Sequence, residues 1–291
     1  MKISEPNPTT LRDALQGSLQ AVDALITTIQ PGVYKLAVHV LGHRDDAADA
    51  TQEILLKVVT HLSGFRSEST FSTWVWRVAY NHLMTARTRK AESPEVSLDA
   101  MTERLAQGLE FAAHITQSRG DSGPLTPQDK LEARQVALSC TQSMLMALDR
   151  EQRLAYVIDT VFDLDSREAA AVMGISPEAY RQRVSRARAR LDAFMSQSCG
   201  LVNPDAACRC ERQLHAVRHL TKLNGVDRGA VVALHKPEME EAERHFAAFT
   251  RVADAAAILR AHPDYQAPEA QRAAILTVLK QEGFMQPGQL Q

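Results

Sequence analysis

Aromatic and basic side chains are concentrated in one stretch of the chain, FRSESTFSTWVWRVAYNHLMTARTRK, which runs from residue 65 to residue 90. It holds both tryptophans of a chain that is only 5% aromatic, and five basic residues against one acidic residue, although the whole chain has a net charge of −2. An aromatic ring beside a guanidinium and an amide can stack on an unpaired base, which contributes about 1–3 kcal/mol per base. The stretch therefore predicts a surface for single-stranded nucleic acid, because the bases of a duplex are already stacked.

One helix within this stretch would present the stacking groups. Trp74, Arg77 and Asn81 follow one another at steps of three and four residues, which is the spacing of a single helix face. Burial alone is the competing explanation, and it suits one of the two tryptophans. We expect Trp74 to meet DNA and Trp76 to lie closer to the core. The basic tail over residues 87–90 would lie along the phosphate backbone.

A second basic stretch, over residues 165–190, holds six basic residues against three acidic ones. Ser166 is a suitable N-cap for a short helix, which would end at Gly174 in a left-handed conformation. Pro177 favours the first turn of the next helix. A short helix, a tight turn and a longer basic helix predict a helix-turn-helix, whose second helix enters the major groove of DNA.

A helical wheel assigns the faces of that second helix. The face expected to be buried carries Tyr180, Val184, Ala187 and Leu191, and the opposite face carries Glu178, Gln182, Ser185, Arg186 and Ala189. Between them lie Arg181, Arg183, Arg188 and Arg190, within reach of phosphates. The alternative is an arginine-rich helix face that is only solvated. Because the turn residues and the apolar stripe agree with the charge, we expect Gln182, Ser185 and Arg186 to read bases.

Thiols and imidazoles form a third group. Cys199, Cys208, Cys210, His215 and His219 lie close together after the second basic stretch. Such a group can bind a thiophilic metal such as zinc or copper(I), can sense redox state, or can be a structural joint, and all three interpretations stay open. For a metal site the expected ligands are Cys199, Cys208, Cys210 and His215.

The elements that position these groups are expected to be helices, which predicts an all-α protein. Apolar residues recur at three- and four-residue steps at Ala47, Ala50, Ile54, Val58 and Leu62. The 291 residues contain no apolar run as long as a membrane span and begin without the apolar segment of a secretory signal, so we expect a cytoplasmic protein. No phosphate-binding glycine loop or catalytic constellation is found, so we expect no enzyme.

Four parts follow one another along the chain. The sequence predicts a helical domain over residues 1–90, an acidic linker over 91–130, a second helical domain over 131–197 and a cysteine-containing helical extension over 198–291. The basic stretches lie in the two helical domains, and residues 91–164 between those stretches carry twelve acidic and six basic residues. This alternation predicts two nucleic-acid contacts joined by a segment that avoids phosphates.

Two blocks of the sequence resemble a known family. HRDDAADATQEILLKVVTHLSGFRSESTFSTWVWRVAYNHL is similar to region 2 of the sigma-70 family, in its extracytoplasmic-function (ECF) branch. LDREQRLAYVIDTVFDLDSREAAAVMGISPEAYRQRVSRARARL is similar to region 4 of that branch. The resemblance implies a non-enzymatic transcription initiation factor, without a required cofactor, that binds core RNA polymerase and promoter DNA. Region 4 would bind the duplex −35 element, and region 2 would melt and bind the single-stranded −10 element.

The resemblance also implies roles for individual residues. Asp49, Gln52 and Glu53 match the helix that docks on the largest polymerase subunit. The residues expected at the −10 element are Phe65, Arg66, Ser67, Glu68, Ser69, Thr70, Phe71, Trp74, Arg77, Asn81 and Arg87. Those expected at the −35 element are Arg181, Gln182, Arg183, Ser185, Arg186 and Arg188.

The extension and one alternative function leave questions open. About a hundred residues follow region 4, where a minimal member of the family ends. These residues form the extension. The length and the thiols of the extension suggest that it regulates activity in response to metal or redox state, in place of a separate anti-sigma factor. The alternative is a stand-alone helix-turn-helix regulator of duplex DNA, which would not need the aromatic surface over residues 65–81.

Overall fold

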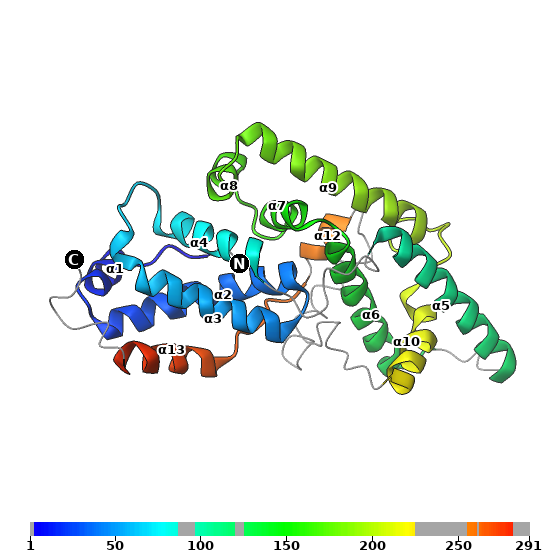
Figure 1. Cartoon of the computed structure of the whole chain (residues 1–291). Coiled ribbons are helices and arrows are strands. Elements are labelled where there is room, and N and C mark those ends of the chain that lie inside the picture. The colour runs from blue at the N-terminus through cyan, green and yellow to red at the C-terminus, as the bar shows by residue number, and fades with distance from the viewer. Residues whose placement is uncertain (1–2, 87–96, 120–124, 225–254, 261, 282–291) are drawn as a thin grey trace. The chain divides into compact units, whose positions relative to one another are not determined.

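The computed structural model describes residues 3–86, 97–119, 125–224, 255–260 and 262–281 (Figure 1). In these ranges the chain is all-helical, apart from an isolated β-bridge between Cys199 and Cys208. The expected fold class is therefore confirmed. The contacts divide the chain into two compact units, and each unit combines segments that are far apart in sequence.

Unit 1 contains residues 1–89, 157–181 and 264–291. Its helices are α1 (Pro8–Leu15), α2 (Leu19–Leu41), α3 (Arg44–Thr60), the 3-10 turn Leu62–Gly64, α4 (Phe71–Thr85), α8 (Ser166–Met173) and α13 (Glu269–Gln281). Unit 2 contains residues 90–156 and 182–263. Its helices are α5 (Leu98–Arg119), α6 (Pro127–Met146), α10 (Cys210–Asn224) and α12 (Ala255–Arg260), and the boundary between the units runs through α7 (Arg150–Thr160) and α9 (Pro177–Ser198).

Helix α2 is the centre of unit 1. It is buried along almost its whole length, begins at the N-cap Ser18 and ends at Gly42, which is left-handed with a φ of 74°. Helix α3 packs against α2 through the apolar stripe that the sequence predicts, because Ala47, Ala50, Ile54 and Val58 are all buried. These two helices form the frame on which α4 lies.

The C-terminal segment also packs on this frame. Helix α13 lies against α2 and α3, with Ile275 and Leu279 almost fully buried. Before α13, Asp264 forms an ion pair with Lys35, whose side chain is 7% exposed, and the Tyr265 ring meets His39 edge-on at 5.4 Å. The segment at residues 264–281 is thus an integral part of unit 1, which its position far from residues 1–89 in the sequence gave no reason to expect.

Acidification is expected to destabilise unit 1 through His39. Burial, followed by the charge of Lys35, lowers the pKa of His39 to about 3. Below pH 6.5 the unfolded chain takes up a proton there that the folded chain does not, so stability should fall by about 1.4 kcal/mol per pH unit. Urea unfolding between pH 6.5 and about 5, above the range in which carboxylates titrate, measures this slope. His39→Gln should reduce this slope without abolishing it, because burial also lowers the pKa of His82. An unchanged slope in that variant would contradict the assignment.

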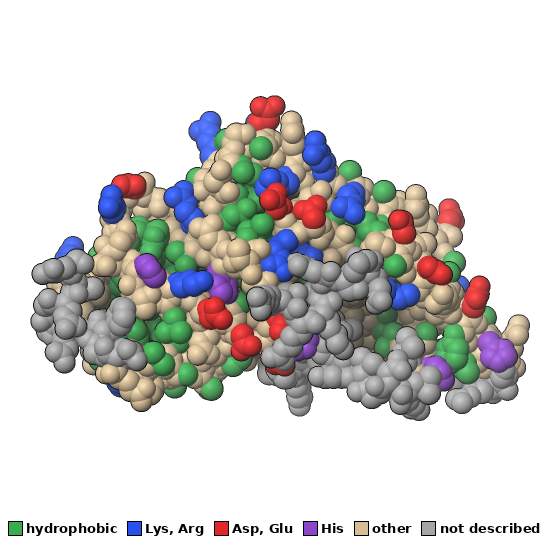
Figure 2. All heavy atoms as spheres, viewed as in Figure 1, with side chains coloured by type: hydrophobic (Ala, Val, Ile, Leu, Met, Phe, Trp, Pro, Cys, Tyr) green, Lys and Arg blue, Asp and Glu red, His purple; other side chains and the backbone are tan. Residues whose placement is uncertain are grey.

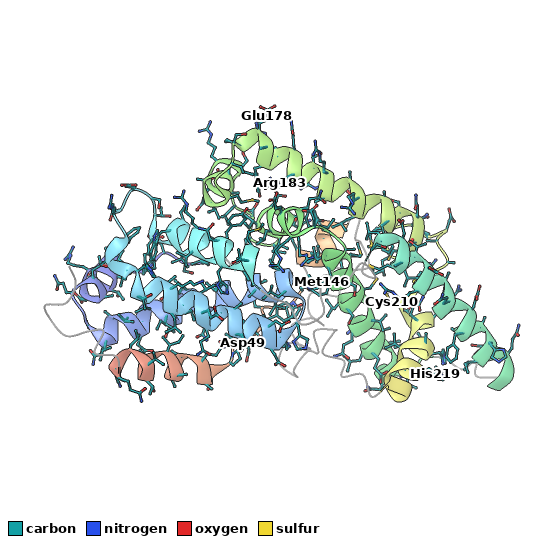
Figure 3. The ribbon with its side chains drawn as sticks, in the orientation of Figure 1. Asp49, Met146, Glu178, Arg183, Cys210 and His219 are labelled. Carbon is teal, nitrogen blue, oxygen red and sulfur yellow. The ribbon has the colours of Figure 1, made fainter. Side chains whose placement is uncertain are left out.

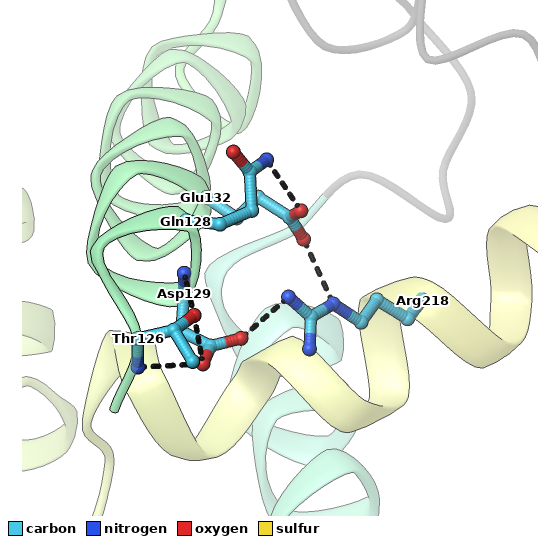
Figure 4. Close-up of polar contacts among 5 residues, drawn as sticks. All are labelled: Thr126, Gln128, Asp129, Glu132 and Arg218. Carbon is cyan, nitrogen blue, oxygen red and sulfur yellow. Dashed lines mark hydrogen bonds and ion pairs between the residues drawn. The ribbon is translucent and has the colours of Figure 1, made fainter. Parts of the chain in front are cut away.

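Unit 2 contains a group of three helices, α5, α6 and α10, in which α10 packs against both of the others. Helices α5 and α10 come close at Gly108, where a Cβ would stand 2.2 Å from Gln213 Oε1 and 3.4 Å from the Cβ of Ala216. Arg218 on α10 donates from Nε to Glu132 at 2.8 Å and from a terminal nitrogen to Asp129 at 2.7 Å (Figure 4). Hydrogen bonds from Thr126, and then that from Arg218, lower the pKa of Asp129 to about 2.

The segment expected as a linker contains regular structure. Helix α5 fills residues 98–119 and α6 begins at Pro127, where Thr126 and Asp129 form a capping box. The turn-rich residues 120–124 between them lie outside the described residues. Sequence reasoning missed α5 because its partner α10 lies about a hundred residues later, so that no local pattern identifies the face it buries.

Candidate nucleic-acid interface

Helix α4 is fixed at its beginning by side chains from two segments. Thr70 caps it, and its Oγ1 accepts from the Thr73 amide at 3.2 Å. The carboxylate of Glu5 accepts from the amides of Phe71 and Ser72 at 2.8 and 2.9 Å. A carboxylate at a helix N-terminus is favoured by the helix dipole. The expected DNA-binding loop, residues 66–70, is exposed just before this anchored helix.

Three aromatic rings form a cluster where the loop meets α4. The centroids of Phe65 and Phe71 are 5.4 Å apart, and Trp74 lies 5.8 Å from Phe65 and 5.7 Å from Phe71. Phe71 is 0% exposed, whereas Phe65 and Trp74 are half-buried. Phe71 therefore supports the other two rings from within, and only Phe65 and Trp74 keep surface that a base can reach.

The second tryptophan belongs to the core. Trp76 is 1% exposed and meets Phe162 edge-on, with ring centroids 4.7 Å apart. The prediction that Trp76 lies closer to the core than Trp74 is confirmed. Burial of this ring fixes the rotation of α4, and that rotation leaves Trp74 at the margin of the helix.

Within unit 1, α8 packs on α4 beside these aromatic rings. Thr73 Oγ1 donates to Glu168 at 3.0 Å, and the exposed guanidinium of Arg77 donates to the carbonyl of Ala171 at 2.8 Å. Asn81 is exposed one turn beyond Arg77. Arg87, the last residue expected at the −10 element, lies outside the described residues.

The helix-turn-helix has the predicted helices, with one correction at its start. The N-cap of α8 is Asp165, whose carboxylate accepts from the amides of Arg167 and Glu168, so the prediction of Ser166 was wrong by one residue. A carboxylate reaches two amides at once, which favours Asp165 as the cap. Gly174 ends α8 with a φ of 67°, and α9 begins at Pro177 as predicted.

The faces of α9 agree with the helical wheel. The buried face carries Tyr180, Val184, Ala187 and Leu191. The residues exposed away from it are Glu178, Gln182, Ser185, Arg186 and Ala189, together with Arg181, Arg188 and Arg190. Arg183, labelled in Figure 3, is half-buried, and its guanidinium pairs with the carboxylate of Glu151 at 2.7 Å. Basic side chains spread over the surface of α8 and α9 in Figure 2. Gln182, Ser185 and Arg186 are thus free of the core and share an open helix face.

Arg153 is a positioning residue that sequence reasoning missed. It is 1% exposed, and its guanidinium donates to the carbonyls of Leu145, Met146 and Leu148 at 2.8 to 3.0 Å. Leu145 and Met146 lie in the last turn of α6 and Leu148 lies two residues beyond it, where the carbonyls of a helix end lack their full set of helical partners. Arg153 therefore fixes the joint between α6 and α7. The sequence gives no signal for it, because one arginine among the charged residues of a helix start is ordinary.

The expected polymerase-binding residues lie on α3. Asp49 (Figure 3) and Glu53 are exposed, and Gln52 is half-buried. Glu53 lies 3.9 Å from the imidazole of His82, whose pKa is lowered by burial and by the charge of Lys57. Gln271 of α13 donates to the carbonyl of Ala48 at 2.7 Å, so the C-terminal segment reaches the residue next to Asp49.

The cysteines lie in unit 2. Cys199, Cys208 and Cys210 line one cavity of about 110 Å³ together with Cys140 of α6, and the four thiols are free. His215 is half-buried on α10 and is not part of the cavity lining, whereas the His219 ring lies against Phe111, with centroids 4.5 Å apart and planes tilted by 34°. Across the ranges that the structure describes, no three His, Cys, Asp or Glu side chains stand in an arrangement ready to hold a metal ion.

No helix within the described ranges is long and apolar enough to cross a membrane.

Comparisons with known proteins identify both basic regions. Residues 25–92 match the family described as Sigma-70 region 2, and residues 138–191 match the family described as Sigma-70, region 4. The ECF RNA polymerase sigma factor SigW of Bacillus subtilis is 24% identical over 181 residues, which cover 62% of this chain and 92% of that protein. The RNA polymerase sigma-H factor of Pseudomonas aeruginosa is 26% identical over 61% of this chain and 87% of its own length.

A third relative and one solved structure match a similar share of this chain. The ECF RNA polymerase sigma-E factor of Escherichia coli is 27% identical over 61% of this chain and 87% of its own length. A structure of the sigma factor RpoE in complex with the anti-sigma factor NepR from Bartonella quintana covers 59% of this chain and 94% of that chain, at 20% identity and a TM-score of 0.37. These matches leave an extra C-terminal part of the chain outside them. With both sigma regions present in this order, the chain belongs to the sigma-70 family, in its ECF branch, as a non-enzymatic sigma factor that directs RNA polymerase to promoters.

Proposed function

We propose that the exposed face of α9 reads the −35 element and that the loop before α4, with Phe65 and Trp74, binds unpaired bases of the −10 element. The observation that supports the first role is the exposure of Gln182, Ser185 and Arg186 opposite a buried stripe. The second role is supported by the half-buried rings of Phe65 and Trp74 beside an exposed polar loop. A stand-alone duplex regulator would use α9 alone and would not need this aromatic surface.

Arg186→Ala is expected to weaken binding to a −35 duplex and to relax base preference at one position. A good side-chain contact to a base edge contributes about 1–3 kcal/mol of discrimination, whereas a phosphate contact contributes equally to every sequence. The measurement is holoenzyme binding to a set of −35 variants at two salt concentrations. Arg181→Ala is the matched control, and it should weaken all duplexes alike. Equal sequence preference in Arg186→Ala and the parent would contradict base reading.

We further propose that polymerase docks on the exposed side of α3, at Asp49, Gln52 and Glu53. Support comes from the exposure of the two carboxylates on a helix whose opposite side is fixed in the core. The proposed place of action is the cytoplasm, where core polymerase and the chromosome meet. Asp49→Arg should reduce co-purification of core polymerase without changing duplex binding by α9.

We also propose that the extension restrains the activity of its own chain, in the role that a separate anti-sigma factor has elsewhere. This proposal is supported by the docking of residues 264–281 on α2 and α3, one residue away from Asp49. Leu279→Asp, which disrupts the buried side of α13, should raise promoter-dependent transcription by the holoenzyme. Unchanged or lower transcription by a variant that is folded would overturn the restraint, and the same assay with zinc or an oxidant tests whether either signal controls it.

A further inference from the structure

The segment that precedes α1 reaches the surface proposed for the −10 element. Residues 3–7, called the arm below and drawn in dark blue in Figure 1, lie before the region 2 match, which begins at residue 25. In this arm, Glu5 accepts from the amide of Phe71 through one carboxylate oxygen and from the amide of Ser72 through the other. Sequence reasoning gave Glu5 no role, because 66 positions separate it from Phe71.

The three amides that come before the first helical bond of α4 all have acceptors. Amides in this position lack a partner within the helix. The hydroxyl of Thr70 accepts from the third of them, that of Thr73, at 3.2 Å. Glu5 accepts from the first two, at 2.8 and 2.9 Å. The cap next to the helix thus supplies one acceptor and the distant arm supplies two, so the start of α4 is anchored mainly by the arm.

The arm is itself held against α2. Ile3 is 4% exposed, and Pro6 is buried. A Cβ at Gly32 in α2 would stand 2.7 Å from Cγ1 of Ile3 and 3.2 Å from its backbone nitrogen and Cα. Glycine inside a helix is destabilising relative to alanine, and the close approach of the arm explains its presence there. Buried residues before and after Glu5 therefore place its carboxylate at the start of α4, although Glu5 itself is exposed.

The residue that Glu5 anchors carries the aromatic cluster. Phe71 is 0% exposed, and its ring lies 5.4 Å from that of Phe65 and 5.7 Å from that of Trp74. Phe65 and Trp74 are the rings that keep surface for a base to stack on. Because Glu5 holds the backbone of Phe71, a shift of the arm is transmitted to both rings through one buried side chain.

The exposed loop before α4 also needs a fixed end. Ser67 in this loop is left-handed with a φ of 56°, a conformation that is costly for a residue other than glycine and persists where the surroundings determine it. The loop begins after the 3-10 turn, where the amide of Phe65 donates to the carbonyl of Leu62 at 3.0 Å. It ends at Thr70, and that end is the one that the arm secures.

We propose that Glu5 is a positioning residue for the −10 element, which sets the aromatic rings and the loop in the arrangement that takes an unpaired base. This role rests on the proposed −10 function of the surface, and Glu5 acts through Phe71 rather than by touching DNA. A direct electrostatic role would have the opposite sign. A carboxylate repels phosphates, so its removal would then strengthen DNA binding, whereas loss of positioning weakens promoter opening.

The test compares full-length chains that carry Glu5→Ala or Glu5→Gln, assembled with core polymerase. Glu5→Ala loses both hydrogen bonds and should reduce open complexes, measured by permanganate reactivity in the −10 element, by about 10-fold. Glu5→Gln keeps one acceptor oxygen and should reduce them by about 3-fold. Binding to a −35 duplex should be unchanged. Asp13→Asn on α1, the matched control, removes the same charge and should open promoters as the parent does.

Two further measurements separate positioning from stability. Hydrogen exchange over residues 65–74 of the free chain should be fastest in Glu5→Ala, intermediate in Glu5→Gln and slowest in the parent. Urea unfolding should change little, because Glu5 is exposed. Gly32→Ala displaces the arm at Ile3 without altering any acceptor of α4, and it should reduce opening in the same direction.

Promoter opening by Glu5→Ala at or above the level of the parent would overturn the positioning role, as would unchanged hydrogen exchange over residues 65–74. Trp74→Ala, measured beside it, separates this role from the proposed function. Normal opening by Trp74→Ala with impaired opening by Glu5→Ala would refute the aromatic surface and support positioning of the loop. Impaired opening by Trp74→Ala with normal opening by Glu5→Ala would refute the role of Glu5 alone.

Discussion

Replacing Trp76 with alanine is expected to lower the free energy of unfolding by about 3–5 kcal/mol. The ring is 1% exposed and meets Phe162 at 4.7 Å, so its removal leaves a large cavity and also ends an aromatic contact. Chemical denaturation of the purified full-length chain measures the change. Because α4 depends on this ring for its rotation, the variant should also initiate transcription poorly, but only in proportion to its loss of folded protein.

Trp74→Ala is the matched comparison and should separate function from stability. Its ring is half-buried beside Phe65 and Phe71, so the loss of stability should be about 1 kcal/mol. Loss of one stacked base should reduce open promoter complexes by about 5- to 150-fold, which corresponds to about 1–3 kcal/mol. Permanganate reactivity of thymines in the −10 element measures opening, and filter binding to a −35 duplex should be unchanged. Promoter opening at the level of the parent would refute the proposed role of Trp74.

Asp264→Asn is expected to destabilise unit 1 by about 2 kcal/mol. The variant keeps the size of the side chain but leaves the ammonium of Lys35, which is 7% exposed, without its counter-charge. Removal of one partner costs about 3–5 kcal/mol in a fully buried pair and less than about 1 kcal/mol at the surface. An intermediate value is expected because the Asp264 side chain is 37% exposed.

The control for this prediction is Arg272→Ala. Arg272 contacts Thr27 at 3.1 Å and Asp23 at 3.4 Å on α2, but its side chain is 47% exposed. Its loss should cost less than about 1 kcal/mol. If Asp264→Asn and Arg272→Ala changed the unfolding free energy equally little, residues 264–281 would not be an integral part of unit 1, and their proposed restraint on α3 would lose its support.

Local patterns predicted those parts of the protein in which the residues that fix a structure lie close together in sequence. The buried stripe of α3, the turn at Gly174 and the two faces of α9 all follow from residues within one or two helical turns. The two basic stretches were visible for the same reason, since each is a short run with a charge opposite to that of its surroundings.

Contacts between distant segments could not be read in this way. The helix α5 looked like linker because it is stabilised by α10, through Gln213 and the close approach at Gly108. Cys140 looked solitary because its cavity is completed by cysteines from Cys199 onward. Residues 264–281 dock on Lys35 and His39 of α2. The sequence of α2 alone does not explain these two polar side chains on a buried helix, because their partners are Asp264 and Tyr265. Spacing along the chain carries no information about such partners.

Reconstitution with core RNA polymerase tests the central claim most directly. Holoenzyme assembled from core enzyme and the full-length chain, or its Leu279→Asp variant, is incubated with a library of promoter-length DNA, and the transcripts are sequenced. The account predicts transcripts from a common start position downstream of shared −35 and −10 sequences, with the −35 preference changed by Arg186→Ala. Transcription that does not depend on the added chain, or stable binding of the chain to duplex DNA but not to core polymerase, would contradict it.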